Sequence, residues 1–474
     1  MLFIKHLNCH AVLAMTVILL SSCGMFSENY IKPQIATPHH WSNDQFFSTK
    51  NTDHNFAVAS LAWWKSVHDV ALNKLIEEVL ANNNDINQAA INIQTAQTLL
   101  HVVNAAWVPS VGVLAGNMTG NFPPLLTNET GNFAGLNVSY TLNVLKIIRE
   151  EKVAKLNIQL QQAVLNGIRL KLISQTASTY YDLIAAHDQL NLCQTEIGDL
   201  TNRKQHLQNQ FDNGLVSQLE ITQNQEQLSN LEGKLPQIQT NITRLQNILQ
   251  VLLNKNPGAL PITKTLANVD LHDVMPKNIS SRTLEQRPDI IIAEYHLKIA
   301  AAKVGISYSN LFPDFNLILP FGVENLGGLN GLNFATTTYW LAILQGTMPL
   351  LDKATYDTIK QAKSANKAQA YAYVETVRAA FADVDNGLAW QINSATTLVK
   401  INEERVAADK TYQLAINRYK LGLISYADTL SYKLQLDNAT NHYNQAKLSQ
   451  INSLINLYQV LGSGYTATNK KGSS

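Results

Sequence analysis

Residues 419–428 read Tyr419-Lys-Leu-Gly-Leu-Ile-Ser-Tyr-Ala-Asp428 and interrupt the longest helical stretch of the chain, residues 354–461. That stretch contains no proline and only two glycines, so the two strongest helix breakers are almost absent from it. Gly422 predicts a reversal, because glycine readily adopts the left-handed conformation that ends a helix, and Ser425 can cap the next helix. The stretch is therefore predicted to be a helical hairpin, whose first arm, 354–420, is ~100 Å long at ~1.5 Å per residue.

The same pattern occurs earlier in the chain. Phe211-Asp-Asn-Gly-Leu-Val-Ser-Gln-Leu-Glu220 places Gly214 at an offset of 422 − 214 = 208 from the second glycine. The segment from Asp85 to Pro109 parallels the segment from Asp289 to Pro313, and both ends are offset by 204 (289 − 85 and 313 − 109). Two nearly constant offsets with the same residue types predict an internal duplication. Each half is expected to form a helix, two strands, a long helix, a turn and a final helix.

The composition excludes several classes of function. The net charge is +1 and only 15% of the residues are charged, against about 25% in an average protein, so no basic face for nucleic acid is indicated. The sequence contains no Walker loop, GxSxG, HExxH or CxxC motif, and no cluster of titratable residues suggests an enzyme. His39 and His40 lie in an extended segment without partner ligands, which favours a solvated pair over a metal site. We therefore expect no catalytic activity and no cofactor.

The first 22 residues are typical of an export signal. Lys5 and His6 precede an apolar run, 11–20, that is too short for a membrane helix but suits a signal peptide. The segment Leu20-Ser-Ser-Cys23 resembles the bacterial lipobox, whose cysteine accepts a diacylglycerol, and by that rule Gly24 indicates outer-membrane sorting. The alternative is an ordinary signal peptide that happens to contain a cysteine. Because Cys23 would be lipidated and Cys9 removed, only Cys193 remains and no intrachain disulfide is expected.

Two segments alternate between apolar and polar residues with a period of two. From 134 to 144 the even positions are apolar and the odd positions polar, and 315–323 repeats this alternation in the second half. Partner strands are expected at 108–116 and 338–348. The length and pattern are typical of strands in an outer-membrane barrel, although a soluble sheet over a core is the alternative. The export signal, and the lack of another run long enough to cross a bilayer, favour the barrel.

Several motifs in this order resemble one known family. They are the lipobox, the Tyr30-x-x-Pro33 of an extended tether, Trp63-Trp64, Arg287-Pro288-Asp289-Ile290, Phe312-Pro313 and the closing Leu457-Tyr-Gln-Val-Leu-Gly462. Together they resemble the outer-membrane efflux channel family, in the lipoprotein branch typified by OprM and related to TolC, over almost the whole mature chain. The resemblance implies a homotrimer in the outer membrane that extends into the periplasm. It also implies a periplasmic adaptor protein and an inner-membrane pump of the resistance-nodulation-division type as partners.

The expected fold is mainly α with a small β part. Four strands cannot close a barrel, since single-chain barrels begin at ~8 strands and open edges are not tolerated in lipid. Three copies would give ~12 strands, continuous with a long periplasmic barrel of helices. The predicted segments are a signal peptide at 1–22, a lipidated tether at 23–60, repeat 1 at 61–260 with a kink at Pro236, a linker at 261–280, repeat 2 at 281–462 and a disordered C-terminal tail at 463–474.

The predicted function is the exit duct of a tripartite efflux system that exports small molecules such as drugs. One alternative is the outer-membrane duct of a type I protein secretion system. Another is a non-conducting periplasmic coiled-coil lipoprotein, which would account for the helices and the lipid anchor but not for the alternating strands.

The two glycine turns are the natural place for a gate, because the hairpins of all copies converge there. The resemblance implies that Tyr419 and Asp428 line the constriction and that Glu220 is the corresponding acid of the other hairpin. Ile424 and Ser431 depart from the family's charged residues, so closure is expected to depend more on packing around Leu423 and Ile424. The alternative role of Glu220 and Asp428 is to cap helix N-termini, where negative charge is favourable.

Overall fold

The computed structural model describes residues 30–35, 61–121, 128–262, 264–271, 281–327 and 336–466. The chain forms two compact units. Unit 1 contains Ile91–Gln162, Ile292–Glu375 and the residues up to Ile35, and unit 2 contains Ala36–Ala90, Ala163–Ile291 and the residues from Thr376. The lipobox, the histidine pair and residues 467–474 lie outside the described residues.

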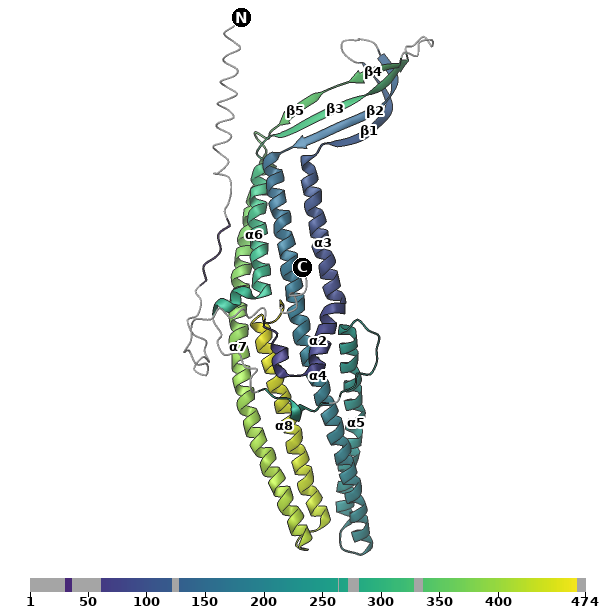
Figure 1. Ribbon diagram of the computed structural model, residues 1–474, viewed down its shortest axis with the longest axis vertical. Helices are drawn as coiled ribbons and strands as arrows, with labels where there is room; N and C mark the ends of the chain where they lie inside the picture. Colours follow the sequence, from purple (N-terminus) through teal and green to yellow (C-terminus); the bar gives the residue numbers. More distant parts are fainter. Residues whose placement is uncertain are drawn as a thin grey trace. The chain divides into compact units, whose positions relative to one another are not determined.

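The two predicted helical hairpins are present (Figure 1). The first consists of α4, Val144–Asp212, and α5, Gln218–Leu252; the second consists of α7, Lys353–Lys420, and α8, Tyr426–Val460. Helices α5 and α8 each have 35 residues, and their first residues are 426 − 218 = 208 positions apart. The α5 helix continues through Pro236, and the kink there stays a prediction.

The elements that precede the two hairpins are separated by the second predicted offset, 204 positions. Helix α3, Asn84–Asn104, and helix α6, Pro288–Ser309, begin 288 − 84 = 204 positions apart. The strands that follow them, β1 at Ser110–Asn121 and β3 at Asp314–Gly327, begin 314 − 110 = 204 positions apart. The additional residues of the second half therefore fall between its first strand and its long helix.

Unit 2 begins with two short helices rather than one. The 3₁₀-helix η4, Trp63–Val67, ends at His68, which has a φ of 55°, and α2, Val70–Asn82, starts after it. Asp69 caps α2 by accepting hydrogen bonds from the backbone amides of Ala71 and Leu72 at 3.0 and 3.1 Å. This cap separates the tryptophan pair from α2.

The tryptophan pair lies in the main hydrophobic cluster of unit 2. Trp63 stacks on Tyr458 of α8 with ring centres 5.1 Å apart, and Trp64 is fully buried. The cluster also includes Leu266 from the linker, within the short 3₁₀-helix η6, Leu266–Asn268. A second 3₁₀-helix, η7, spans Ser281–Gln286 and leads to α6.

The chain beyond α8 is packed against this unit as far as the structure describes it. Residues 463–465 are buried, and the Tyr465 hydroxyl donates to the backbone carbonyl of Gln286 at 2.8 Å. We predicted a disordered tail from residue 463. The Tyr465 ring and its hydrogen bond instead bind this segment to unit 2, so residues 463–465 are ordered.

Arg287, from the Arg-Pro-Asp motif, joins three helices of unit 2. Its Nε and Nη2 donate to the Asp289 carboxylate at 3.1 and 2.7 Å, and Nη2 also donates to Asp383 of α7 at 3.1 Å. Nη1 donates to the backbone carbonyls of Val460 at 2.7 Å and Ala380 at 3.3 Å. The motif thus connects the start of α6, the middle of α7 and the last turn of α8.

Unit 1 contains an antiparallel sheet in the order β1-β2-β3-β4, where β2 spans Asn128–Leu142 and β4 spans Thr336–Trp340. The predicted fourth strand is divided, because β5, Ile343–Thr347, pairs with β3 separately. The register does not slip, since Phe321 faces Trp340 and Ile318 faces Ile343. Pro320 lies opposite the break and has no amide hydrogen to donate, although its carbonyl accepts from Leu341 at 3.0 Å.

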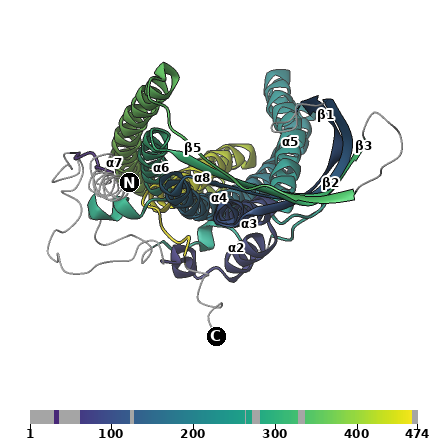
Figure 2. The ribbon, with the colours of Figure 1, turned by 90° about the horizontal axis from the view of Figure 1, so that it is seen from above.

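The two faces of the sheet carry different side chains, as the alternation predicted. One row across the strands holds Val113, Leu136, Phe321 and Trp340, all of them exposed, while the next row holds Gly112, Asn137 and Pro320. Seen from above, the strands follow a curved arc (Figure 2).

The strands β2 and β3 approach each other closely at one pair of glycines. Gly135 and Gly322 face each other, and a Cβ atom on Gly135 would lie 2.3 Å from the carbonyl oxygen of Phe321. Only glycine fits at this crossing. Among the helices in the described part of the chain, none is both long enough and apolar enough to cross a membrane.

Candidate functional site

The two hairpin turns have the same backbone structure. Gly214 and Gly422 both have a φ of 73°, in the left-handed region where glycine is favoured. At the second turn Gly422 donates to the carbonyl of Tyr419 at 2.9 Å and Leu423 donates to that of Arg418 at 2.9 Å. The first turn repeats this pair of bonds, which satisfies the last carbonyls of the preceding helix. The predicted reversals are therefore confirmed at both glycines.

The acid that follows each turn caps the next helix. Ser425 donates from its amide at 3.1 Å and from its hydroxyl at 2.7 Å to the Asp428 carboxylate, and the Asp428 amide donates back to the hydroxyl at 3.0 Å. Glu220 accepts in the same way from Ser217, and these hydrogen bonds hold the pKa of Glu220 below its usual value. Both acids therefore have the capping role that we considered as the alternative, and a role in a gate remains a proposal.

The apolar residues of the second turn contact little of their own chain. Leu423 is 64% exposed and Leu421 is 74% exposed, while Ile424 is half-buried. At the first turn Leu215 and Leu219 are likewise exposed. Both turns therefore expose leucines in the single chain, and the packing that we expected around Leu423 and Ile424 in the closed channel stays a prediction.

Aromatic residues connect the two hairpins near the turns, within unit 2. The Tyr419 ring lies 5.6 Å from the Tyr426 ring, which meets the His206 ring of α4 edge to face at 4.5 Å. Leu207 and Ile221 of the first hairpin pack on Ala427 of the second. The ends of the hairpins therefore form one packed layer, in which Tyr419 is still 44% exposed.

Arg203 of α4 is a charged residue of this layer that the sequence did not reveal. Burial lowers the pKa of the Arg203 guanidinium, and the attraction of the Asp428 carboxylate opposes that effect. The family resemblance implied a charged residue at position 424, where this chain has isoleucine. Here a positive charge comes from the first hairpin of the same chain. No local pattern predicts Arg203, because its role depends on which helices pack together.

A second charged group connects the hairpins closer to their middle. Lys433 Nζ of α8 lies 2.5 and 2.7 Å from the Asp437 carboxylate oxygens and 3.7 Å from Asp199 Oδ2 of α4. Burial raises the pKa of Asp437, and the hydrogen bond from Lys433 offsets part of that shift. In the described ranges, no three His, Cys, Asp or Glu side chains are placed to bind a metal ion.

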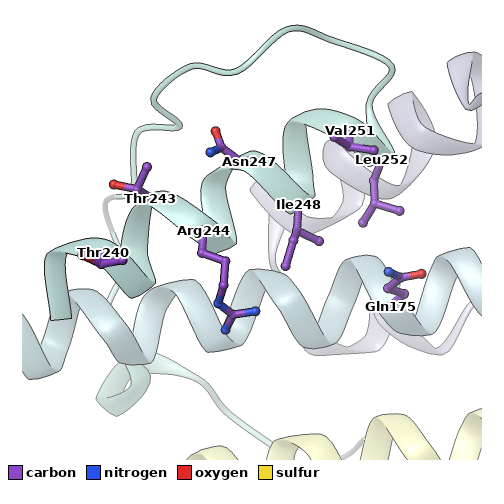
Figure 3. Close-up of a pocket in the computed structure, with 8 residues that line it drawn as sticks. All are labelled: Gln175, Thr240, Thr243, Arg244, Asn247, Ile248, Val251 and Leu252. Carbon is purple, nitrogen blue, oxygen red and sulfur yellow. The ribbon is translucent and has the colours of Figure 1, made fainter. Parts of the chain in front are cut away.

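The surface of the first hairpin also carries a hollow of about 700 Å³ between α4 and α5. Figure 3 shows Arg244 and Ile248 pointing from α5 toward α4, whereas Asn247 points away. The residues that line the hollow mostly carry hydroxyl, amide or aliphatic side chains. They are Gln175, Thr240, Thr243, Arg244, Asn247, Ile248, Val251 and Leu252. Arg244 is the single charged residue among them, so the hollow offers no acid–base pair for catalysis.

Comparisons with known proteins match the whole arrangement. The model of the family described as outer membrane efflux protein matches residues 75–255 and again residues 279–463. The probable efflux pump outer membrane protein TtgC of Pseudomonas putida is 27% identical, over 96% of this chain and 95% of its own. The probable outer membrane lipoprotein SilC of Salmonella typhimurium is 24% identical, over 95% of this chain and 97% of its own.

Solved structures show the same fold. The open state of the MtrE outer membrane channel of Neisseria gonorrhoeae is similar with a TM-score of 0.79 and 21% identity, and the match covers 94% of this chain and 99% of that one.

Proposed function

The chain belongs to the outer membrane efflux protein family, and we propose that it is the outer-membrane exit channel of a tripartite efflux system that exports small molecules. Its relatives are channel components of efflux pumps rather than enzymes. The observation that carries the proposal is the sheet of unit 1, which has one apolar and exposed face in a chain that is otherwise helical hairpins.

The state that we propose is a homotrimer. One chain leaves β1 on one edge of its sheet and β4 with β5 on the other, and unpaired edges are not tolerated in lipid. Three copies close ~12 strands into one barrel, with the row that contains Leu136 and Phe321 facing lipid. The long hairpins then form a second barrel in the periplasm.

The location and partners that we propose follow from the relatives. SilC is named as an outer membrane lipoprotein, which supports lipidation of Cys23 in this chain. TtgC is named as an outer membrane protein of an efflux pump, which supports an adaptor protein and an inner-membrane pump as partners. The resemblance of the sequence motifs favours a pump of the resistance-nodulation-division type.

The gate that we propose lies at the hairpin turns, where Tyr419 and Asp428 of each copy narrow the pore. The exposed Leu423 and the half-buried Ile424 pack against the neighbouring copies, and Glu220 with Arg203 completes the charged layer. Because Arg203 comes from the first hairpin, opening must change its distance from Asp428 or carry both hairpins together.

Conductance in a planar bilayer tests both the channel and its gate. The purified trimer should conduct, Tyr419→Ala should raise the resting conductance, and Asp428→Asn should weaken the preference for cations. The asparagine variant removes the charge but keeps an acceptor for the Ser425 amide, whereas Asp428→Ala also loses that acceptor and with it one half of the capping box. Asp212→Ala, an exposed acid at the same end of the hairpins, serves as the control.

Two results would contradict the proposal. A monodisperse monomer that conducts would refute the shared barrel. If Tyr419→Ala and Asp428→Asn both conduct like the wild type, the constriction lies elsewhere.

A further inference from the structure

The first described residues of the chain, 30–35, lie against helix α6 within unit 1. Lys32 Nζ is 3.7 Å from Glu294 Oε2, and Lys298 Nζ is 2.6 Å from Glu294 Oε1. The same Lys298 ammonium lies 5.3 Å from the centre of the Tyr30 ring and 5.0 Å from that of Tyr295. We call these five residues the tether contact.

The charged groups of the tether contact have opposite signs and stabilise one another. Burial acts to raise the pKa of Glu294, but the hydrogen bond and charge of Lys298, together with Lys32, outweigh burial and hold this pKa below its usual value. Lys298 is attracted to two aromatic faces as well as to the carboxylate. The side chains of Glu294 and Lys298 are only 22% and 29% exposed, so solvent screens this group less than an ordinary surface ion pair.

The duplication supplies an internal comparison. At the offset of 204, Glu294, Tyr295 and Lys298 of α6 correspond to residues 90, 91 and 94 of α3, which are alanine, isoleucine and glutamine. The two helices otherwise begin at equivalent positions. The charged and aromatic residues of the contact therefore occur on α6, which meets residues 30–35, and are replaced by uncharged, non-aromatic residues at the equivalent positions of α3.

The position of the contact limits how far a lipid on Cys23 can reach. Tyr30 is 30 − 23 = 7 residues from Cys23. Whatever path they take, seven residues span at most ~24 Å at ~3.4 Å each. Along α6, Glu294 is 309 − 294 = 15 residues from the last helical residue, Ser309, which is ~22 Å at ~1.5 Å per residue. The sheet begins at Asp314, shortly after the helix.

We infer that α6 carries a binding site for the chain's own N-terminal segment, and that this site sets the reach of the lipid anchor so that the acyl chains enter the bilayer level with the base of the sheet. The inference rests on the proposed lipidation of Cys23 and on the proposed membrane-spanning sheet. The anchor thereby holds α6 and the sheet at one depth in the membrane, because a shorter segment cannot reach the lipid while the contact is closed.

Pulsed electron paramagnetic resonance of the full chain in lipid bilayers tests this. Spin labels are attached at Ile31→Cys and His296→Cys, which are exposed positions outside the tether contact, in a Cys193→Ala background. When labelled chains are diluted with an excess of unlabelled ones, so that a trimer holds one labelled copy, the chain of native length should give one narrow distance distribution. Deleting residues 25–28 leaves three residues, or ~10 Å, so the lipidated form should lose the narrow population. An insertion of four residues after Gly24 should keep it.

The decisive variant is the same deletion in a Cys23→Ser chain exported with an ordinary cleavable signal peptide, which is unlipidated and has no third thiol for the label. This variant should recover the narrow distance distribution, because no lipid in the bilayer then restrains the N-terminal segment. Glu294→Gln should broaden the distribution with or without lipid. Asp357→Asn, which breaks an exposed ion pair with Lys360 in the same unit, should leave it unchanged.

Two outcomes overturn the inference. A narrow distribution in the shortened, lipidated chain means that the lipid is reached by another route. A broad distribution in the shortened chain both with and without lipid means that residues 25–28 themselves form the contact. Mass spectrometry of Cys23 and conductance of the same samples are read separately. An unlipidated wild type refutes the anchor and this inference with it, whereas a lipidated protein that does not conduct refutes the channel alone.

Discussion

Replacing Arg287 with alanine should locally unfold the junction of α6, α7 and α8. The guanidinium is only 8% exposed and donates to two carboxylates and two backbone carbonyls. Asp289 and Asp383 are about half exposed, so losing each ion pair costs roughly 0 to 1 kcal/mol. Ala380 lies inside α7, so its carbonyl keeps its helical partner, but the carbonyl of Val460, the last residue of α8, loses its donor at about 1 to 3 kcal/mol. A total of about 3 kcal/mol follows.

Amide hydrogen exchange of the protein in detergent measures this locally, without requiring reversible unfolding. A loss of about 3 kcal/mol corresponds to a ~100-fold faster exchange. The increase should be found at the end of α8, where the Ser463 amide donates to the Tyr458 carbonyl at 2.9 Å. Asp383→Asn, the control, should change exchange by less than ~10-fold. Arg287→Lys should be intermediate, since an ammonium cannot reproduce the bidentate geometry.

Amide exchange in Arg287→Ala that stays within a factor of about three of the wild-type rate would contradict this expectation. Water would then have replaced the guanidinium at the carbonyl of Val460. An increase spread evenly over the whole chain would instead mean that the junction unfolds only with the entire protein.

Three further perturbations test other parts of the structure. Burial raises the pKa of Asp437, so folding favours the protonated form of this carboxyl. As the pH falls from neutrality toward 3.8, the wild type should therefore gain stability relative to Asp437→Asn. Denaturation at several pH values measures this difference. Gly135→Val should prevent the sheet from folding, because the new Cβ would lie 2.3 Å from the backbone oxygen of Phe321. In the control Gly112→Val, the new Cβ has no atom within 4 Å, so this variant should fold normally. Heat-modifiability gels compare the two variants. Gly422→Ala should lower the free energy of unfolding by ~1 to 2 kcal/mol, because alanine is strained at a φ of 73°. Gly233→Ala, inside α5 with free space around it, should instead raise it by ~0.5 to 1 kcal/mol. Thermal denaturation measures both changes.

The features that the sequence predicted correctly are those that depend on near neighbours. The turns at Gly214 and Gly422 were predictable because a glycine with φ near 73° and a serine three residues later act within a few residues of each other. The apolar face of β2 and β3 was predictable because alternate residues of a strand point to opposite sides.

The features that it did not predict depend on distant partners. The break between β4 and β5 arises from Pro320 on the neighbouring strand, and the local sequence of 336–347 does not encode it. Arg203 enters the layer at the turns only because α4 packs on α8. Likewise, the order at Tyr465 depends on a carbonyl 179 residues earlier in the chain.

The pairing of β2 with β3 also determines the order in which the chain can fold during export. Strands β1 and β2 are close together in the sequence. In contrast, Val138 of β2 pairs with Leu319 of β3, which is 319 − 138 = 181 residues later in the chain. Contacts of such separation form slowly, whereas helical hairpins use local contacts. The whole first hairpin therefore leaves the translocation machinery while the apolar face and open edge of β2 are still unpaired. We expect this nascent β-hairpin to be the segment that periplasmic chaperones bind, and that it is released when β3 arrives.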